Sequence, residues 1–88
     1  MTWTRETIRS ELITVFKQHV EEGAPITETS HLVADLGIDS LGVMEVIADL
    51  EDKFKLTIPD EALRHVDTID DVAVAIEGKL KADGRFTG

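Results

Sequence analysis

The chain has 88 residues, of which 42% are hydrophobic and 5% aromatic, enough for one small domain with an aliphatic core. It contains no cysteine, which excludes disulfides and thiolate metal sites. The formal net charge of −9 argues against nucleic-acid binding, because phosphate repels an acidic surface. With no basic-then-apolar leader and no apolar run near the roughly 18 residues of a membrane span, we expect a cytoplasmic protein.

The excess negative charge is concentrated in the middle of the chain. Between residues 35 and 61, eight acidic residues face only two lysines, so this segment carries six of the nine excess charges. Such a segment favours partners that present a basic patch.

The first helix is expected over residues 5–20, with Thr4 as its N-cap. Trp3 either packs on this helix or frays, and Gly23 and Pro25 end it. Its apolar residues recur at helical spacing: Ile8, Leu12, Val15, Phe16 and Val20.

Residues 21–38 show no sustained period but hold too many apolar groups for a free linker. We therefore expect a long ordered loop, since such loops are uncommon in compact domains unless they serve a function. His31 within it is interpreted as a solvated loop histidine.

The second helix is expected from Ser40 to about Lys55, with Asp39 as N-cap. Gly42 in its first turn costs about 1 kcal/mol relative to alanine, and either admits a close surface or has no role. An apolar edge beside the acids is either the shoulder of the core or a partner contact, and consists of Leu41, Met44 and Ala48. The core face comprises Val43, Val46, Ile47, Leu50 and Phe54.

The rest of the chain predicts an extended segment before Pro59, a short helical turn over residues 60–64 and a last helix. That helix opens with a capping box of Thr68 and Asp71. Its buried stripe is Ile69, Val72, Ala73, Ile76 and Leu80. The fold class is therefore all-α: a small four-helix bundle of three main helices and one short helix, with a long first loop. We expect a single domain over 1–88, with frayed tails at 1–3 and 82–88.

Ser40 is the side chain that invites a chemical role. Its surroundings miss the G-x-S-x-G spacing of a nucleophile elbow, and none of the three histidines has a recognisable triad context, so we expect no enzyme. The acids do not follow a calcium-loop pattern, so no metal site is expected. A serine at a helix N-terminus is well placed for a phosphodiester, although the position alone favours the simpler interpretation, a residue that only caps the helix.

The run Asp35-Leu36-Gly37-Ile38-Asp39-Ser40-Leu41 is followed by an acidic helix and by Ile58-Pro59-Asp60-Glu61. In these residues the chain resembles the acyl carrier proteins, the family of phosphopantetheine-bearing carriers. The resemblance implies that Ser40, beside Asp39, carries covalent 4′-phosphopantetheine and holds acyl intermediates as thioesters for fatty-acid or polyketide-type biosynthesis. The alternatives are an aminoacyl or peptidyl-type carrier of a specialised pathway, and an acidic helical binding module that is no carrier.

The resemblance also implies a monomer with several partners: a phosphopantetheinyl transferase, and acyltransferase, ketosynthase or ligase-type enzymes with basic patches. The partner-binding residues it implies are Leu41, Met44, Glu45, Asp49, Glu51 and Asp52. A cargo could be sheltered between the helices by Val46, Ile47, Leu50, Ile58, Leu63, Val66 and Ile76, which are also simply core residues. Gly42, Arg64 and His65 depart from the acids often found there in carriers of primary fatty-acid synthesis, and put a housekeeping role in doubt.

Overall fold

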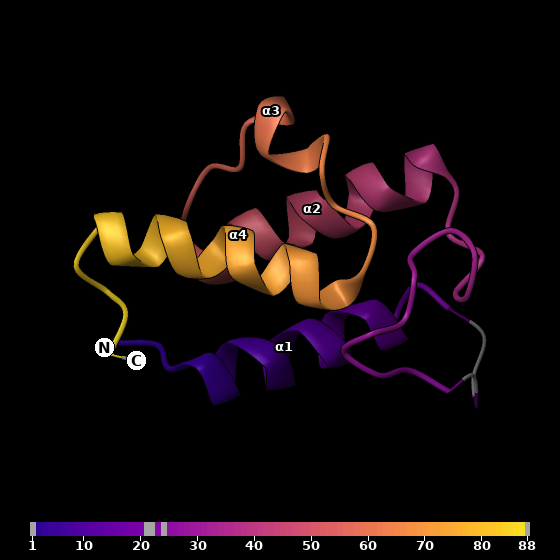
Figure 1. Ribbon diagram of the computed structural model, residues 1–88, viewed down its shortest axis with the longest axis horizontal. Helices are drawn as coiled ribbons and strands as arrows, with labels where there is room; N and C mark the ends of the chain where they lie inside the picture. The colour runs from indigo at the N-terminus through magenta and orange to yellow at the C-terminus, as the bar shows by residue number, and fades with distance from the viewer. Residues whose placement is uncertain (1, 21–22, 24, 88) are drawn as a thin grey trace.

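The structure, a computed structural model, describes residues 2–20, 23 and 25–87. It contains four helices, α1 (Arg5–Lys17), α2 (Ser40–Phe54), α3 (Asp60–Leu63) and α4 (Ile69–Ala82), which confirms the predicted bundle (Figure 1). Helix α1 packs against both α2 and α4 and runs opposite to them. The termini meet at one end of the molecule, and the start of α2 lies at the other (Figure 1). Across the described residues, no helix is both long and apolar enough to cross a membrane.

The helix starts follow the predicted caps. Thr4 accepts a hydrogen bond from the Thr7 amide, and Thr68 and Asp71 form the expected capping box. Helix α1 ends at Lys17, three residues earlier than predicted. The chain turns there because the His19 amide bonds back to the Phe16 carbonyl, while the His19 imidazole reaches across to α2.

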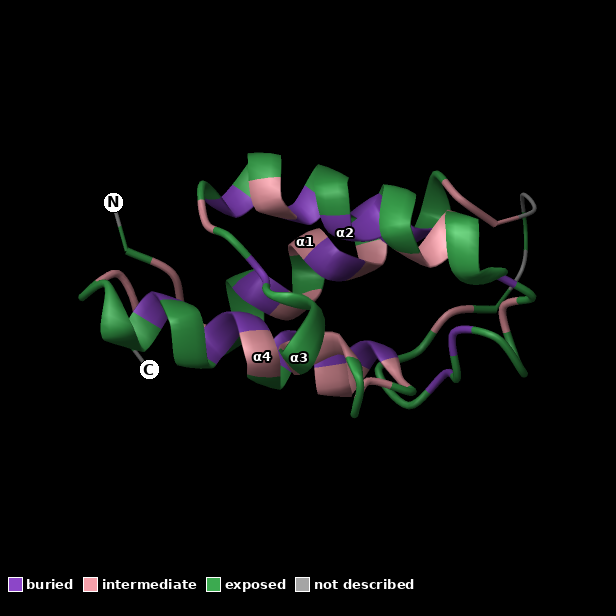
Figure 2. Ribbon diagram, turned by 90° about the horizontal axis from the view of Figure 1, so that it is seen from above, coloured by how far each residue is buried: buried purple, intermediate pink, exposed green. Residues whose placement is uncertain are grey.

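The core is built from the predicted stripes of the three long helices (Figure 2). On α2 every predicted core residue is buried except Val43, which is half-buried. The long loop contributes Leu32 and Ile38 to the same core, so its described part from residue 25 to 38 is attached to the bundle, as predicted.

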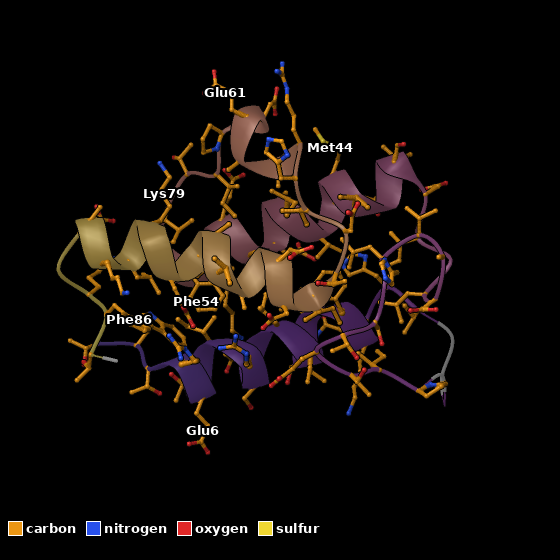
Figure 3. The ribbon with its side chains drawn as sticks, in the orientation of Figure 1. Glu6, Met44, Phe54, Glu61, Lys79 and Phe86 are labelled. Atoms are coloured by element: carbon orange, nitrogen blue, oxygen red, sulfur yellow. The ribbon has the colours of Figure 1, made fainter. Side chains whose placement is uncertain are left out.

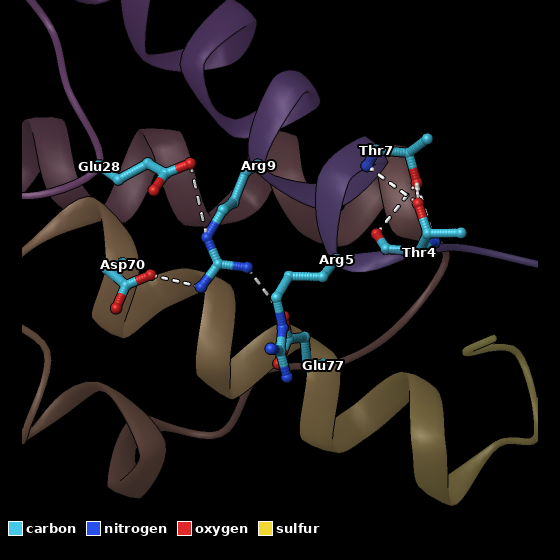
Figure 4. A network of polar contacts seen from close by, with 7 residues as sticks. All are labelled: Thr4, Arg5, Thr7, Arg9, Glu28, Asp70 and Glu77. Atoms are coloured by element: carbon cyan, nitrogen blue, oxygen red, sulfur yellow. Dashed lines mark hydrogen bonds and ion pairs between the residues drawn. The ribbon is translucent and has the colours of Figure 1, made fainter. Parts of the chain in front are cut away.

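A polar cluster ties α1 to α4 and to the loop (Figure 4). Glu77, only 6% exposed, accepts hydrogen bonds from Arg5 and Arg9, each at 3.0 Å. Arg9 also pairs with Asp70 and with Glu28 of the loop. The hydrogen bond to Asp70 is the main cause of the raised pKa of Arg9. The sequence pattern did not single out Glu77, because its burial depends on arginines 68 and 72 residues away.

The chain ends differ from the expected fraying. Trp3 packs on Phe54, with 4.5 Å between ring centroids, and its amide donates to the Arg85 carbonyl at 2.7 Å. The Arg85 guanidinium in turn donates to the carbonyls of Phe54 and Lys55, at 2.7 and 2.9 Å. Residues 85–87 and Trp3 therefore close the C-terminal end of α2, while Met1 and Gly88 lie outside the described residues.

Candidate functional site

The loop before α2 holds the start of that helix in place through local backbone contacts. The Ile38 amide donates to the Leu32 carbonyl at 3.0 Å, and the Ile38 side chain is buried. Gly37 turns the chain with φ of +68°, a left-handed conformation that suits glycine. The two residues that follow Ile38 are thereby fixed at the surface.

Ser40 is the first residue of α2, and it does not act as the cap. Asp39 is the cap: its Oδ1 accepts from the Gly42 amide at 2.7 Å. Among the described residues, neither the exposed Ser40 hydroxyl nor the amides of Ser40 and Leu41 have a hydrogen-bond partner. A free hydroxyl beside two unpaired amides at the positive end of a helix dipole fits a phosphate ester.

The loop before α2 leaves no room for a side chain at Gly42. A Cβ at this position would lie 2.7 Å from Cγ2 of Ile38 and 3.2 Å from the capping oxygen of Asp39. Of the two readings left open by the sequence, the structure supports close approach, and the approaching surface is the chain's own loop.

The described residues provide no base for Ser40. None of His19, His31 and His65 hydrogen-bonds to it, and His19 instead pairs with Asp49 at 2.8 Å. No group of three or more histidine, aspartate or glutamate side chains in this part of the chain is arranged to hold a metal ion. A nucleophilic serine needs a base within hydrogen-bond reach, and these three histidines do not supply one.

The residues assigned to partner binding separate into two groups. Leu41 and Met44 are 68% and 57% exposed, and Glu45 and Asp52 are exposed on the same helix. Figure 3 shows Met44 of α2 and Glu61 of α3 projecting from the same edge of the molecule, opposite Glu6 of α1.

Two further acids of that set also have contacts within the fold. Glu51 is half-buried, and its Oε2 accepts from the Ile58 amide at 2.8 Å. Asp49 is exposed but is held by the ring of His19. Both carboxylates therefore have a structural use, whatever they contribute to recognition.

Most of the cargo candidates are core residues. Five of them are buried in the core: Val46, Ile47, Leu50, Ile58 and Ile76. Leu63 and Val66 are half-buried. A pocket of about 280 Å³ lies elsewhere, lined by residues 31–34 of the loop, Val43 of α2, Val66 and Asp67. It shares only Val66 with the candidates, and nothing in the residue spacing indicated that the loop would form its wall.

The small helical bundle and the unpaired groups at the start of α2 are compatible with one class of protein, a carrier of a phosphate-linked group. The model of the phosphopantetheine attachment site family matches residues 6–76. The chain is 35% identical over 85 residues to the acyl carrier protein of Rhodococcus erythropolis, covering 96% of this chain and 92% of that one. It is 51% identical over 55 residues to that of an Exiguobacterium species, covering 62% and 70%. A solved Mycobacterium tuberculosis structure, described as a "putative acyl carrier protein", superposes with a TM-score of 0.73 at 28% identity, over 78% and 93% of the two chains.

The chain belongs to the acyl carrier protein family. Proteins of this family are non-catalytic and carry covalent 4′-phosphopantetheine. They interact with phosphopantetheinyl transferases and with biosynthetic enzymes in general. The unpaired amides and hydroxyl at the start of α2 fit the phosphate of that group, which supplies a thiol that the chain itself lacks.

Proposed function

We propose that Ser40 Oγ carries the phosphopantetheine arm, and that the arm holds acyl intermediates as thioesters for fatty-acid or polyketide-type biosynthesis. The observation that supports this most is the free, exposed Ser40 hydroxyl at the first position of α2, with Asp39 as the cap beside it. In the attachment step, the hydroxyl oxygen forms a phosphodiester with the pantetheine-side phosphate of coenzyme A. The phosphoanhydride bond breaks, 3′,5′-ADP leaves and the hydroxyl proton is lost.

The chain's own residues hold the site for this transfer and do no chemistry themselves. Asp39 satisfies the Gly42 amide, which leaves the amides of Ser40 and Leu41 to stabilise the phosphate. The exposed acids Glu45 and Asp52 lie on the same helix as the apolar contacts and suit a basic partner surface. Rim charges of this kind speed encounter more than they tighten binding, as a carrier that visits several enzymes requires.

The test is intact-mass spectrometry after incubation with a phosphopantetheinyl transferase, coenzyme A and Mg²⁺. We expect the wild-type protein to gain the mass of one arm and Ser40→Ala to gain none. Ser10→Ala is the matched control, because Ser10 is an exposed helix serine on α1. Equal gains in wild type and Ser40→Ala, or no gain in either, would contradict the proposal.

A further inference from the structure

The pocket beside α2 is within reach of Ser40. Val43, which lines it, lies three residues after Ser40, about one helical turn along α2. Its other walls are the loop at residues 31–34 and the segment Val66–Asp67 before α4. These two walls are joined, because the Leu32 amide donates to the Asp67 carbonyl at 2.9 Å. The pocket is thus a fixed feature of the fold close to the proposed attachment point.

Its size limits what it can hold. An apolar cavity of about 150 Å³ takes one benzene molecule, so about 280 Å³ suits a group of roughly ten non-hydrogen atoms or fewer. A longer chain would extend beyond the pocket, and the buried core offers it no space. Leu50 and Ile76 have no exposed surface, and opening such contacts is unfavourable.

The lining is not purely apolar. His31 and Asp67 are its two residues with polar side chains, and both are exposed. Among the described residues, neither of these side chains has a hydrogen-bond or ion-pair partner, so both are available to a guest. An acidic acceptor beside an imidazole favours a group that donates a hydrogen bond.

We propose, building on the proposed function, that this pocket receives a short acyl group bearing a hydroxyl or amino substituent, recognised by Asp67 and His31. The cargo class is therefore short and polar, and it lies against the loop instead of between the core side chains named from the resemblance. One net hydrogen bond changes the docked fraction by about 2- to 10-fold.

The experiment loads Ser40 with one of four groups (butanoyl, 3-hydroxybutanoyl, 3-aminobutanoyl or dodecanoyl) from the corresponding coenzyme A thioester, and confirms each load by mass. Thioester half-life and amide chemical shifts are then measured. We expect the 3-hydroxybutanoyl or the 3-aminobutanoyl thioester to outlast the butanoyl thioester about 2- to 10-fold, with amide shifts at residues 31–34, 43 and 66–67. Whichever of these two polar cargoes responds shows whether a hydroxyl or an amino group donates the hydrogen bond. Dodecanoyl should not shift the amides of Leu50 and Ile76.

The double variant His31→Ala/Asp67→Ala should remove the advantage of the polar cargo. Its matched control is Asp60→Ala/His65→Ala, which deletes the same two residue types from exposed positions outside the pocket lining. Equal half-lives for polar and butanoyl cargo, an advantage that survives in the pocket variant, or dodecanoyl shifts at Leu50 and Ile76 would each overturn the inference. Failure to load at all would instead count against the proposed function.

Discussion

A substitution at Glu51 tests whether an acidic residue of α2 stabilises the fold or serves only to bind partners. The family resemblance makes it a partner contact, yet its carboxylate accepts the Ile58 amide at 2.8 Å, and Ile58 is only 6% exposed. In Glu51→Ala that amide loses its acceptor. A partly buried donor left unsatisfied costs about 1–3 kcal/mol, so we expect a loss of that size in the free energy of unfolding.

The assay is urea denaturation of the unmodified protein, with Asp52→Ala as the control. Asp52 is the next residue, its carboxylate is 87% exposed, and its only described pairing is with Lys55 at 3.7 Å. An exposed pair of this kind contributes little, so the control should unfold close to wild type with the same denaturant slope. If Glu51→Ala is as stable as Asp52→Ala, the hydrogen bond does not hold the segment after α2, and the reasoning is refuted.

Three other substitutions test the remaining local arguments. Gly42→Ala should lower stability in thermal melts despite its better helix propensity of about 1 kcal/mol, because the added methyl meets Ile38; a higher melting temperature would contradict this. The pKa of Asp71 is lowered mainly by two backbone amides at the start of α4, so its contribution is present at neutral pH and lost as the pH falls through the depressed value. The stability deficit of Asp71→Asn should therefore be full at pH 7 and shrink below about pH 4, and a pH-independent deficit would count against it. Arg85→Ala should lower the free energy of unfolding by about 1–2 kcal/mol in denaturant titrations, because it removes the donor to the Phe54 carbonyl at the end of α2. An unchanged free energy of unfolding would show that this hydrogen bond does not stabilise the fold.

The features predictable from the sequence are those fixed by neighbouring residues. Thr4, Asp39 and Thr68 each start a helix because the capping side chain and its amide lie within three residues. The buried stripes are equally local, since helical spacing alone puts them on one face.

What the sequence could not supply are contacts between distant residues. Helix α1 ends early where His19 meets Asp49, thirty positions further on. The hydrogen bond from Arg85 to the Phe54 carbonyl spans a similar separation, so the C-terminal segment alone predicts a frayed tail. For the candidate site, Ser40 and its exposed neighbours were predicted. The structural use of Glu51 was not, because it depends on how the segment after α2 places the Ile58 amide against that carboxylate.

The pocket could not be predicted from the sequence either, because its walls come from three separate segments of the chain. The arrangement of these segments also suggests why the fold contains a pocket. Helix α1 is the element on which α2 and α4 both pack. The loop bridges the N-terminal ends of α2, into which it runs, and of α4. It is held to α4 by the Leu32–Asp67 backbone bond and by that between the Ile69 amide and the Ser30 carbonyl. A space lined by such a bridge can be left unfilled without removing any contact of the α1 interfaces. The bundle therefore keeps its core intact and still has a hollow one turn from the residue proposed to carry the cargo.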